Sequence, residues 1–275
     1  MPTIVAKETI VPLLAEEWAA VAEMCSSLQE PEFMMQSCLP GWTVKDQLSH
    51  ITGIELMLNG VRAPEVDVTH LTHLKNDVAR MGEVWVEDMR SLSGAEVLQI
   101  FLDVTTERLA ALQAMTQEQF DAHSWTPVSA DETYGRFMRI RHYDTFMHEH
   151  DIRQALGLED RADPAAIGSA LLEIEPSLGY IVGRKAGLPE GSRIRIDLTG
   201  EVQRTYLVEV TDRARVVDNL SAAAAASVEV SMPVMVFFRL TGGRCEPSEV
   251  IAEQVLLAGD QELALQLASN LSFTL

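Results

Sequence analysis

The chain has 275 residues, of which 47 % are hydrophobic and 23 % are charged, and its formal net charge at pH 7 is −20. A chain of this length and apolar content is long enough to form two ordinary globular domains, each with a buried core. The negative charge repels phosphate backbones and anionic membrane surfaces, and it therefore disfavours binding to nucleic acids or membranes.

We expect no targeting or membrane-spanning segment in this sequence. No apolar run approaches the ~20 residues of a membrane span. The acidic N-terminus lacks a basic region followed by a long apolar one, so we expect no signal peptide. The cysteines are scattered and odd in number, which favours a reducing cytoplasm over a disulfide framework; they are Cys25, Cys38 and Cys245.

Apolar residues at helical spacing dominate the first half of the chain. Thr43 is typical of an N-cap, and Ser93 to Glu96 form a capping box. A loop is expected over residues 124–133, and no strand is expected before residue 157. The segments predicted as helices are 10–28, the one that follows Thr43, 74–89, the one that follows Ser93, and 137–157. They predict a four-helix bundle.

The pattern changes after Gly157. Alternation of apolar and polar residues predicts strands over 193–198, 205–210 and 228–232, and the last follows an alanine-rich linker, Ala222 to Ala226. A short apolar strand is expected at 255–257. Helices are predicted to begin at Asp163-Pro164, at Pro233 and at Asp260. The sequence therefore predicts an α+β chain with two domains, 1–160 and 161–275, the second smaller than the first.

Two polar residues interrupt the apolar face of the helix predicted over 137–157. Asp144 and His148 are four positions apart, so their Cβ atoms lie roughly 5–6 Å from each other on one side of the helix. Groups so placed can reach one metal ion. The alternative is an Asp–His hydrogen bond buried inside the bundle.

His50 offers a third ligand from a separate helix. A lone histidine on the edge of an apolar helical face is more often a core residue with satisfied hydrogen bonds than a ligand. Together with Asp144 and His148 it gives two imidazoles and one carboxylate, the open arrangement of a catalytic zinc site. Four-helix bundles form such sites from side chains on facing helices.

Three polar neighbours on the same helix are less suitable as ligands. His150 lies about 200° around the helix from His148, and His142 about 120° from it, so both point elsewhere. We expect them to be surface or interdomain residues, and Glu149 is also set aside.

The stretch from Trp42 to His50, WTVKDQLSH, resembles the W-[ST]-V-x-D-x-x-x-H opening of the mycothiol-dependent maleylpyruvate isomerase family, a DinB-like group. The stretch from Asp144 to Arg153, DTFMHEHDIR, is similar to that family's second signature. Val228–Arg244 and Leu257–Leu275 resemble its appended sterol-carrier-protein-like domain. The resemblance covers nearly the whole chain.

The resemblance implies a divalent metal, usually zinc, held by His50, Asp144 and His148. It also implies mycothiol as a thiol cofactor, bound to the metal as thiolate, and a small electrophile as the substrate. The expected reaction is cis-trans isomerisation or thiol S-transfer by a cytoplasmic monomer or homodimer. One departure is that the isomerase has Glu where this chain has the shorter Asp144.

A cationic side chain would stabilise a dicarboxylate substrate and its enolate. Arg80 and Arg90 lie in the stretch Asn76–Arg90, which resembles a family segment that contributes to the site. Arg239, on the short helix after Pro233, is a third candidate. The alternative for Arg80 and Arg90 is a solvated side chain. Arg239 either closes over the cleft or covers its own domain.

Two other functions remain open. The first is a non-enzymatic stress-response protein that binds a metal in the bundle and an apolar ligand in the α+β domain. The second is a purely structural bundle in which Asp144 and His148 form a buried hydrogen-bonded pair.

Overall fold

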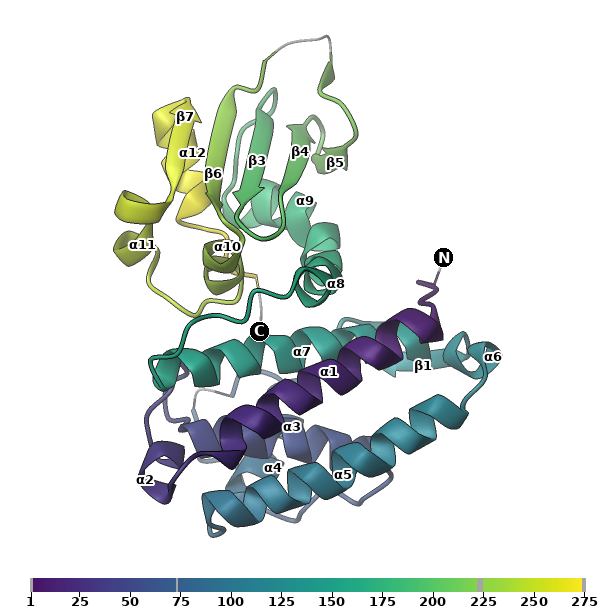
Figure 1. Cartoon of the computed structure of the whole chain (residues 1–275). Helices are drawn as coiled ribbons and strands as arrows, with labels where there is room; N and C mark the ends of the chain where they lie inside the picture. The colour runs from purple at the N-terminus through teal and green to yellow at the C-terminus, as the bar shows by residue number, and fades with distance from the viewer. Residues whose placement is uncertain (1, 73, 222–224, 274–275) are drawn as a thin grey trace. The chain divides into compact units, whose positions relative to one another are not determined.

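The computed structural model describes residues 2–72, 74–221 and 225–273. The chain divides into two compact units, of which the first ends at Arg161 and the second begins at Ala162 (Figure 1). The first unit is mainly helical and the second combines helices with a five-stranded sheet. The predicted α+β class is therefore confirmed. Part of the predicted linker, residues 222–224, lies outside the described residues.

Long helices form the frame of the first unit. α3 contacts α4, α5 and α7, while α1 contacts α5 and α7 (Figure 1). The helices of this unit are α1 (Lys7–Ser26), α2 (Glu30–Phe33), α3 (Val44–Leu58), α4 (Asp77–Met89), α5 (Gly94–Ala114), α6 (Gln117–Phe120) and α7 (Tyr134–Ala155). The contact between α3 and α7 matters most here, because these two helices carry the polar residues singled out above.

Side chains fix where the helices begin. Thr43 accepts a hydrogen bond from the backbone N–H of Asp46, whose carboxylate accepts one in return from the N–H of Thr43. Ser93 and Glu96 form the same reciprocal pair at α5. Both predicted N-caps are confirmed. Each pair satisfies backbone donors that the first helical turn leaves without partners.

A glycine allows α4 to pack closely against α3. A Cβ atom at Gly53 would lie 2.2 Å from the Cβ of Trp85, so only glycine fits there. Around this contact the interior is filled by fully buried aliphatic and aromatic side chains, among them Leu14, Leu48, Phe101 and Leu112. The close packing brings the N-terminal half of α4 next to His50.

The first unit also contains a hairpin that the sequence does not predict. β1 (His123–Thr126) and β2 (Ser129–Thr133) pair antiparallel where a loop is expected. The Oγ1 atom of Thr126 donates to the carbonyl of Ser129 at 2.9 Å and accepts from its N–H at 3.1 Å, which closes the turn. Most of the hairpin is exposed. An exposed hairpin needs no alternating apolar residues, so periodicity carries no signal for it.

The second unit is built on a mixed sheet with the strand order β5-β4-β3-β6-β7. β3 and β6 pair in parallel, and the other neighbours pair antiparallel. The strands are β3 (Arg193–Thr199), β4 (Arg204–Val210), β5 (Ala214–Val217), β6 (Val228–Pro233) and β7 (Leu256–Gly259). The predicted strands are confirmed, while β5 was not predicted.

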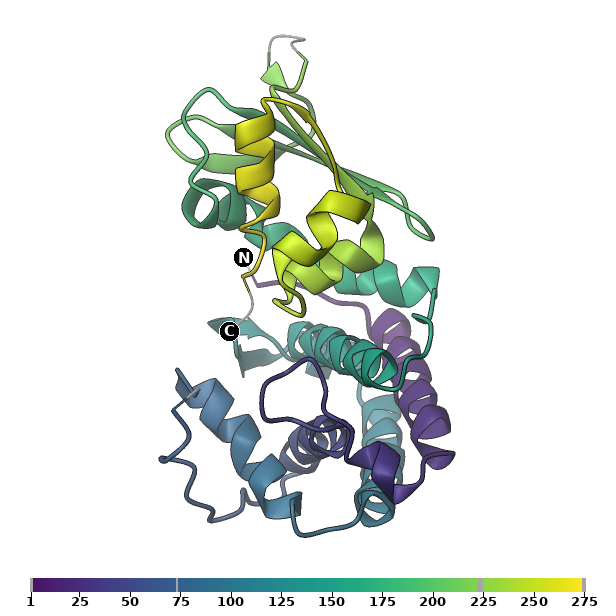
Figure 2. The same cartoon turned by 90° about the vertical axis from the view of Figure 1, so that its left-hand side faces the viewer.

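Helices pack on this sheet, with α12 along β6 and β7 and α10 next to β3 and β6 (Figure 1, Figure 2). The helices are α8 (Pro164–Ile174), α9 (Leu178–Tyr180), α10 (Val234–Thr241), α11 (Pro247–Gln254) and α12 (Gln261–Ala268), with a 3-10 turn at Glu175–Ser177 and a π-helical turn at Ile181–Lys185. Asp260 caps α12 as predicted. α11 was not predicted.

One helical run, Pro164–Lys185, is long and apolar enough to cross a membrane by length and composition. The sequence pattern did not lead us to expect such a run. Its apolar side chains, Ile167, Leu171 and Ile174 among them, are buried in the protein. More than half of its most apolar stretch is buried in this way (56 %). Its composition is therefore explained by its place in a core.

Candidate metal centre

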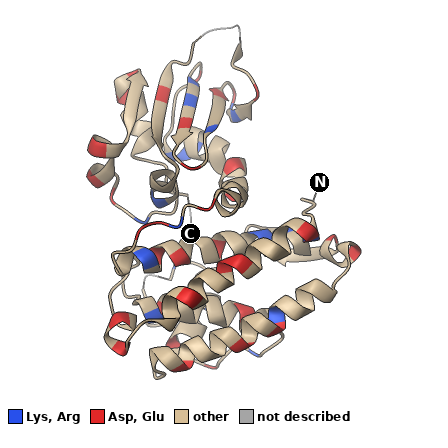
Figure 3. Ribbon diagram, in the orientation of Figure 1, with Lys and Arg blue, Asp and Glu red and all other residues tan. Residues whose placement is uncertain are grey.

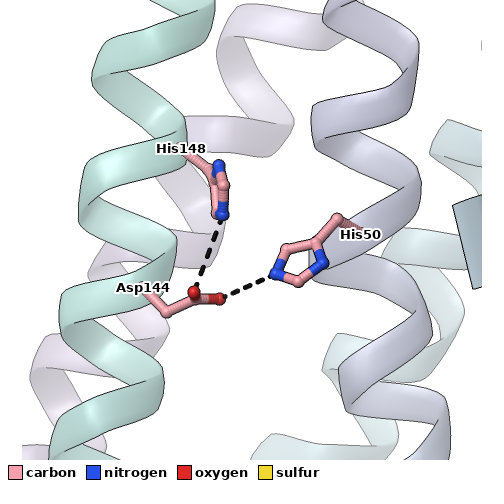
Figure 4. A group of neighbouring side chains, drawn as sticks. All are labelled: His50, Asp144 and His148. Carbon is pink, nitrogen blue, oxygen red and sulfur yellow. Dashed lines mark hydrogen bonds and ion pairs between the residues drawn. The ribbon is translucent and has the colours of Figure 1, made fainter. Parts of the chain in front are cut away.

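Three polar side chains from two neighbouring helices point toward one another: His50 from α3, and Asp144 and His148 from α7 (Figure 4). The Nε2 atom of His50 lies 3.3 Å from Oδ2 of Asp144. The Nε2 atom of His148 lies 3.6 Å from Oδ1 of the same carboxylate. One ligand atom from each residue lies within 4.8 Å of the other two. The residues predicted as ligands are therefore neighbours in space.

These atoms are close enough together to bind a single ion. Ligand atoms that are 2.0–2.2 Å from a tetrahedral ion lie about 3.4 Å from each other. The distances from the two histidines to the carboxylate, one to each of its oxygens, are near that value, and one ligand atom from each residue lies within 4.8 Å of the other two. Imidazole nitrogens and a carboxylate oxygen are also donors that zinc accepts. The group can therefore hold a metal ion, and no second group of this kind was found in the part of the chain that the structure describes.

The far side of the His148 ring is held by polar neighbours. Its Nδ1 atom contacts Oε1 of Gln47 and lies 3.3 Å from Oδ2 of Asp151. The amide of Gln47 donates to Oγ of Ser37 at 2.9 Å, and the thiol of Cys38 donates to Oδ1 of Asp151 at 3.2 Å. Acceptors around Nδ1 favour a proton there, which leaves the lone pair of Nε2 for a metal.

On the side of the ring away from Asp144, His50 is held by packing rather than by a hydrogen bond. Its Nδ1 atom is buried and has no hydrogen-bond partner among the described residues. A Cβ atom at Gly82 of α4 would lie 3.0 Å from this Nδ1 atom. The glycine therefore leaves the space that the imidazole of His50 occupies.

Asp144 is paired with an arginine three positions earlier on α7. Nη1 of Arg141 contacts Oδ2 of Asp144. The Nε atom of Arg141 donates to Oε1 of Glu55 at 2.9 Å, and Arg108 donates to Oε2 of the same glutamate at 3.2 Å. The hydroxyl of Tyr134 accepts a hydrogen bond from Arg108 at 3.0 Å. The sequence prediction missed Arg141, although its spacing of three from Asp144 places it on the same face.

Burial and charge shift the protonation of the three candidate ligands. Burial alone would raise the pKa of Asp144, but Arg141 and the two histidines hold it well below its ordinary value. Burial lowers the pKa of His50, and Asp144 opposes this only in part. Burial would also lower the pKa of His148, but Asp144 and Asp151 raise it. The carboxylate is thus ionised and His50 is neutral near pH 7, as ligands must be.

The indole of Trp42 lies beside both histidines. Its ring centroid is 5.2 Å from that of His50 and 5.9 Å from that of His148. Its Nε1 atom donates to Oε2 of Glu83 at 3.1 Å. Trp42 is half-buried, so it forms a partly exposed wall of the cluster. The sequence motif contains Trp42 but does not predict its place next to the histidines.

The three arginines proposed from the sequence lie in different surroundings. Arg90 is 3.7 Å from Oε1 of Glu83 and 3.3 Å from Oδ2 of Asp46. It therefore pairs with the same glutamate that accepts the hydrogen bond from Trp42. Arg80 pairs with Asp77 on an exposed stretch of α4. Arg239 is on α10 in the second unit. None of these contacts involves a candidate ligand, and their catalytic roles stay predictions.

The polar residues that helical geometry set aside do lie outside the metal group. His150 donates from Nδ1 to the carbonyl of Phe146 at 2.8 Å. Glu149 accepts from Arg153 at 2.6 Å. His142 lies 3.7 Å from Oε2 of Glu17. All three set-aside residues are buried, so the expectation that the two histidines could be surface residues is wrong: their aromatic and charged neighbours enclose them.

A family model described as the mycothiol maleylpyruvate isomerase N-terminal domain matches residues 14–153, about half of the chain. The chain belongs to this family. The match contains α3 and α7 and therefore all three residues of the cluster. The predicted family is thus confirmed. A search of curated proteins found no match.

Two solved structures resemble the whole chain. The crystal structure of the mycothiol-dependent maleylpyruvate isomerase matches with a TM-score of 0.61 at 14 % identity, covering 94 % of this chain and 96 % of that one. A variant of that isomerase with one histidine replaced by alanine matches with a TM-score of 0.57 at 13 % identity, with the same coverage. At such low identity the likeness shows the fold alone, and it shows it for both units.

Proposed function

We propose that the protein is a metal-dependent enzyme that uses a low-molecular-weight thiol, mycothiol, on a small electrophile. One observation carries the proposal: two imidazoles and one carboxylate converge with the spacing of ligands on a single ion. Three protein ligands leave a coordination position open, which is the mark of a catalytic rather than a structural zinc site. Membership of the isomerase family supports the same conclusion.

In this proposal His50, Asp144 and His148 hold zinc. The bound ion would supply a positive centre at which a thiol loses its proton and becomes a nucleophile at neutral pH. Gln47 and Asp151 orient His148 through its Nδ1 atom. The indole of Trp42 shields the two imidazoles on one side.

Thiolate addition to a cis double bond, rotation about the resulting single bond and departure of the thiolate would give isomerisation, whereas a retained thiol would give S-transfer. A cationic side chain that stabilises the carboxylates of the substrate completes the site. Arg80, Arg90 and Arg239 remain candidates for this role. Asp144 in place of the Glu of the isomerase keeps both reactions open.

Further parts of the proposal follow from composition and family. The three scattered cysteines favour a reducing cytoplasm. We propose that residues 1–160 form the metal-binding bundle. Residues 161–275 form the α+β domain, which we propose to be sterol-carrier-protein-like. The net charge of −20 disfavours nucleic acids and membranes as partners, and we propose a monomer or a homodimer.

Cobalt-loaded protein titrated with mycothiol tests the proposal, because the visible spectrum of cobalt reports a change of ligand. We expect one equivalent of cobalt, a spectral change that saturates with mycothiol, and turnover of maleylpyruvate or a related electrophile. His148→Ala should abolish cobalt binding, while His150→Ala, two residues further along the same helix, should retain it.

The outcomes separate the rival functions. A protein that binds cobalt without a spectral response to mycothiol would be the non-enzymatic metal- and ligand-binding protein. A folded protein that binds neither cobalt nor zinc would be the structural bundle with a buried Asp144–His148 pair. Either result would overturn the proposed enzyme.

A further inference from the structure

Arg141 belongs to a buried row of alternating charges that ends at the metal centre. The order is Arg108, Glu55, Arg141 and Asp144, and each residue contacts the next. The first three are almost completely buried. Buried charges are tolerated when they are paired. We therefore expect all four residues to be ionised and their side chains to be held in place by these contacts.

The row changes the charge of the metal centre. Arg108 offsets Glu55, and Arg141 offsets Asp144, so the four residues sum to zero. His50 and His148 are neutral when they serve as ligands. Asp151 lies 3.3 Å from His148 and is a further carboxylate, beyond these two pairs, that can offset a divalent ion. Without Arg141, Asp144 and Asp151 together would cancel the ion.

Arg141 also has a hydrogen-bond donor without an acceptor, next to its contact with Asp144. Its Nη2 atom is buried and has no hydrogen-bond partner in the described part of the chain. Nη2 shares a carbon atom with Nη1, which contacts Asp144. A buried guanidinium N–H without an acceptor is costly, and natural proteins rarely leave one unless a ligand supplies the acceptor.

We propose that Arg141 makes the metal centre selective for anions. Its positive charge cancels that of Asp144, so the loaded centre keeps a net positive charge, and its Nη2 atom donates to an anion next to the open position. The selected class is small monoanions with an acceptor atom, such as carboxylates and thiolates. The inference rests on the proposed metal site and adds a residue that determines what binds there.

The charge around the centre contrasts with the rest of the protein. Acidic residues outnumber basic ones by 41 to 21, and they occur throughout both units (Figure 3). An anion would be repelled by such a surface at long range. Buried charges are screened much less than exposed ones. The guanidinium of Arg141 next to the metal ion can therefore attract an anion at short range, against the repulsion by the acidic surface.

Azide and acetate binding to cobalt-loaded protein tests the inference, with the visible spectrum as the readout. Arg141→Gln should bind both anions at least tenfold more weakly than the wild type, because it lacks both the charge and the donor. Arg108→Gln is the matched control: Arg108 is equally buried, but it contacts Glu55 and no candidate ligand, so its loss leaves the Arg141–Asp144 pair next to the ion in place. This control should stay within about threefold of the wild type.

Arg141→Lys separates charge from geometry and also serves if the glutamine variant does not fold. It keeps the charge but lacks the planar pair of donors, so azide affinity should stay within about threefold while acetate affinity falls at least tenfold. Equal anion affinities in Arg141→Gln and Arg108→Gln would overturn the inference, as would unchanged acetate affinity in Arg141→Lys. Failure of the wild type to bind cobalt would overturn the proposed function itself.

Discussion

The indole Nε1 atom of Trp42 donates a hydrogen bond to Oε2 of Glu83, 3.1 Å away, and so joins the loop before α3 to α4. The bond fixes the indole beside the imidazoles of His50 and His148. Glu83 is buried and also lies 3.7 Å from Arg90. Trp42 is therefore part of the wall of the candidate metal centre and not only an apolar residue of a sequence motif.

Cobalt binding should quench the fluorescence of Trp42, because quenching by a paramagnetic ion falls steeply with distance. In Trp42→Phe most of this quenching should disappear, while cobalt binding stays at one equivalent. Trp125→Phe is the control, since Trp125 lies in the exposed hairpin and contacts Phe137 instead. Equal quenching in the two variants would show that the ion does not bind beside Trp42.

Gln47 should affect metal affinity without touching the ion. Its Oε1 atom contacts Nδ1 of His148, and loss of such a partner typically lowers metal affinity 10–100-fold. We therefore expect Gln47→Ala to bind zinc at least tenfold more weakly in a chelator competition. Gln47→Glu supplies another oxygen acceptor for Nδ1 and should stay within about threefold of the wild type.

Gln99→Ala, at an exposed position on α5, is the control for the alanine variant and should leave zinc affinity unchanged. If Gln47→Ala bound zinc as tightly as this control, the orientation of His148 would rest on Asp151 and packing alone.

Local patterns in the sequence were sufficient to predict much of the fold and two of the three residues of the cluster. Capping at Thr43 and Ser93 depends on residues three positions apart, and the Asp144–His148 pair depends on one helical turn. Such relationships follow from helix geometry alone. The β1–β2 hairpin was missed because it is short, mostly exposed and stabilised by polar contacts of Thr126 and Ser129.

The charged surroundings of the site could not be predicted in the same way. Arg80 and Arg90 were chosen on the resemblance of their segment, but the rotation of α4 directs Arg80 to Asp77 and Arg90 to acidic neighbours. Arg141 faces Glu55 because α3 and α7 are side by side, a tertiary contact that no local pattern contains. The residues near one another in sequence determine where a helix forms, whereas the pairing of charges between helices depends on how the helices pack.

Gly82 should be required for the position of His50. A Cβ atom there would lie 3.0 Å from Nδ1 of His50, closer than ordinary packing allows, so Gly82→Ala should displace the imidazole and lower zinc affinity at least tenfold. Gly168→Ala is the control, because a Cβ atom at this helical glycine meets nothing within 4 Å. The control should be neutral or more stable by up to ~1 kcal/mol. Unchanged zinc affinity in Gly82→Ala would show that Gly82 is not required for the position of His50.

Glu17 should make the stability of the protein depend on pH. Burial raises the pKa of Glu17 well above its ordinary value; the hydrogen bond with Glu149 acts in the same direction, and Arg161 opposes both. Between the ordinary pKa and this raised pKa, the native state binds more protons than the unfolded state. The contribution of Glu17 to stability therefore falls as the pH rises through that interval.

Glu17→Gln removes this titration and keeps a side chain of the same shape. In chemical denaturation the free energy of unfolding of the variant should rise relative to that of the wild type as the pH increases from the ordinary pKa of a glutamate to the raised pKa of Glu17. Glu16→Gln, at the exposed neighbouring position of α1, should show a constant difference. A difference for Glu17→Gln that moved in the opposite direction would mean that Arg161 outweighs burial and that the carboxylate is ionised in the native state. Besides Glu149 and Arg161, His142 also faces Glu17. The contribution of His142 can be tested by the same measurement on Glu17→Gln combined with His142→Gln.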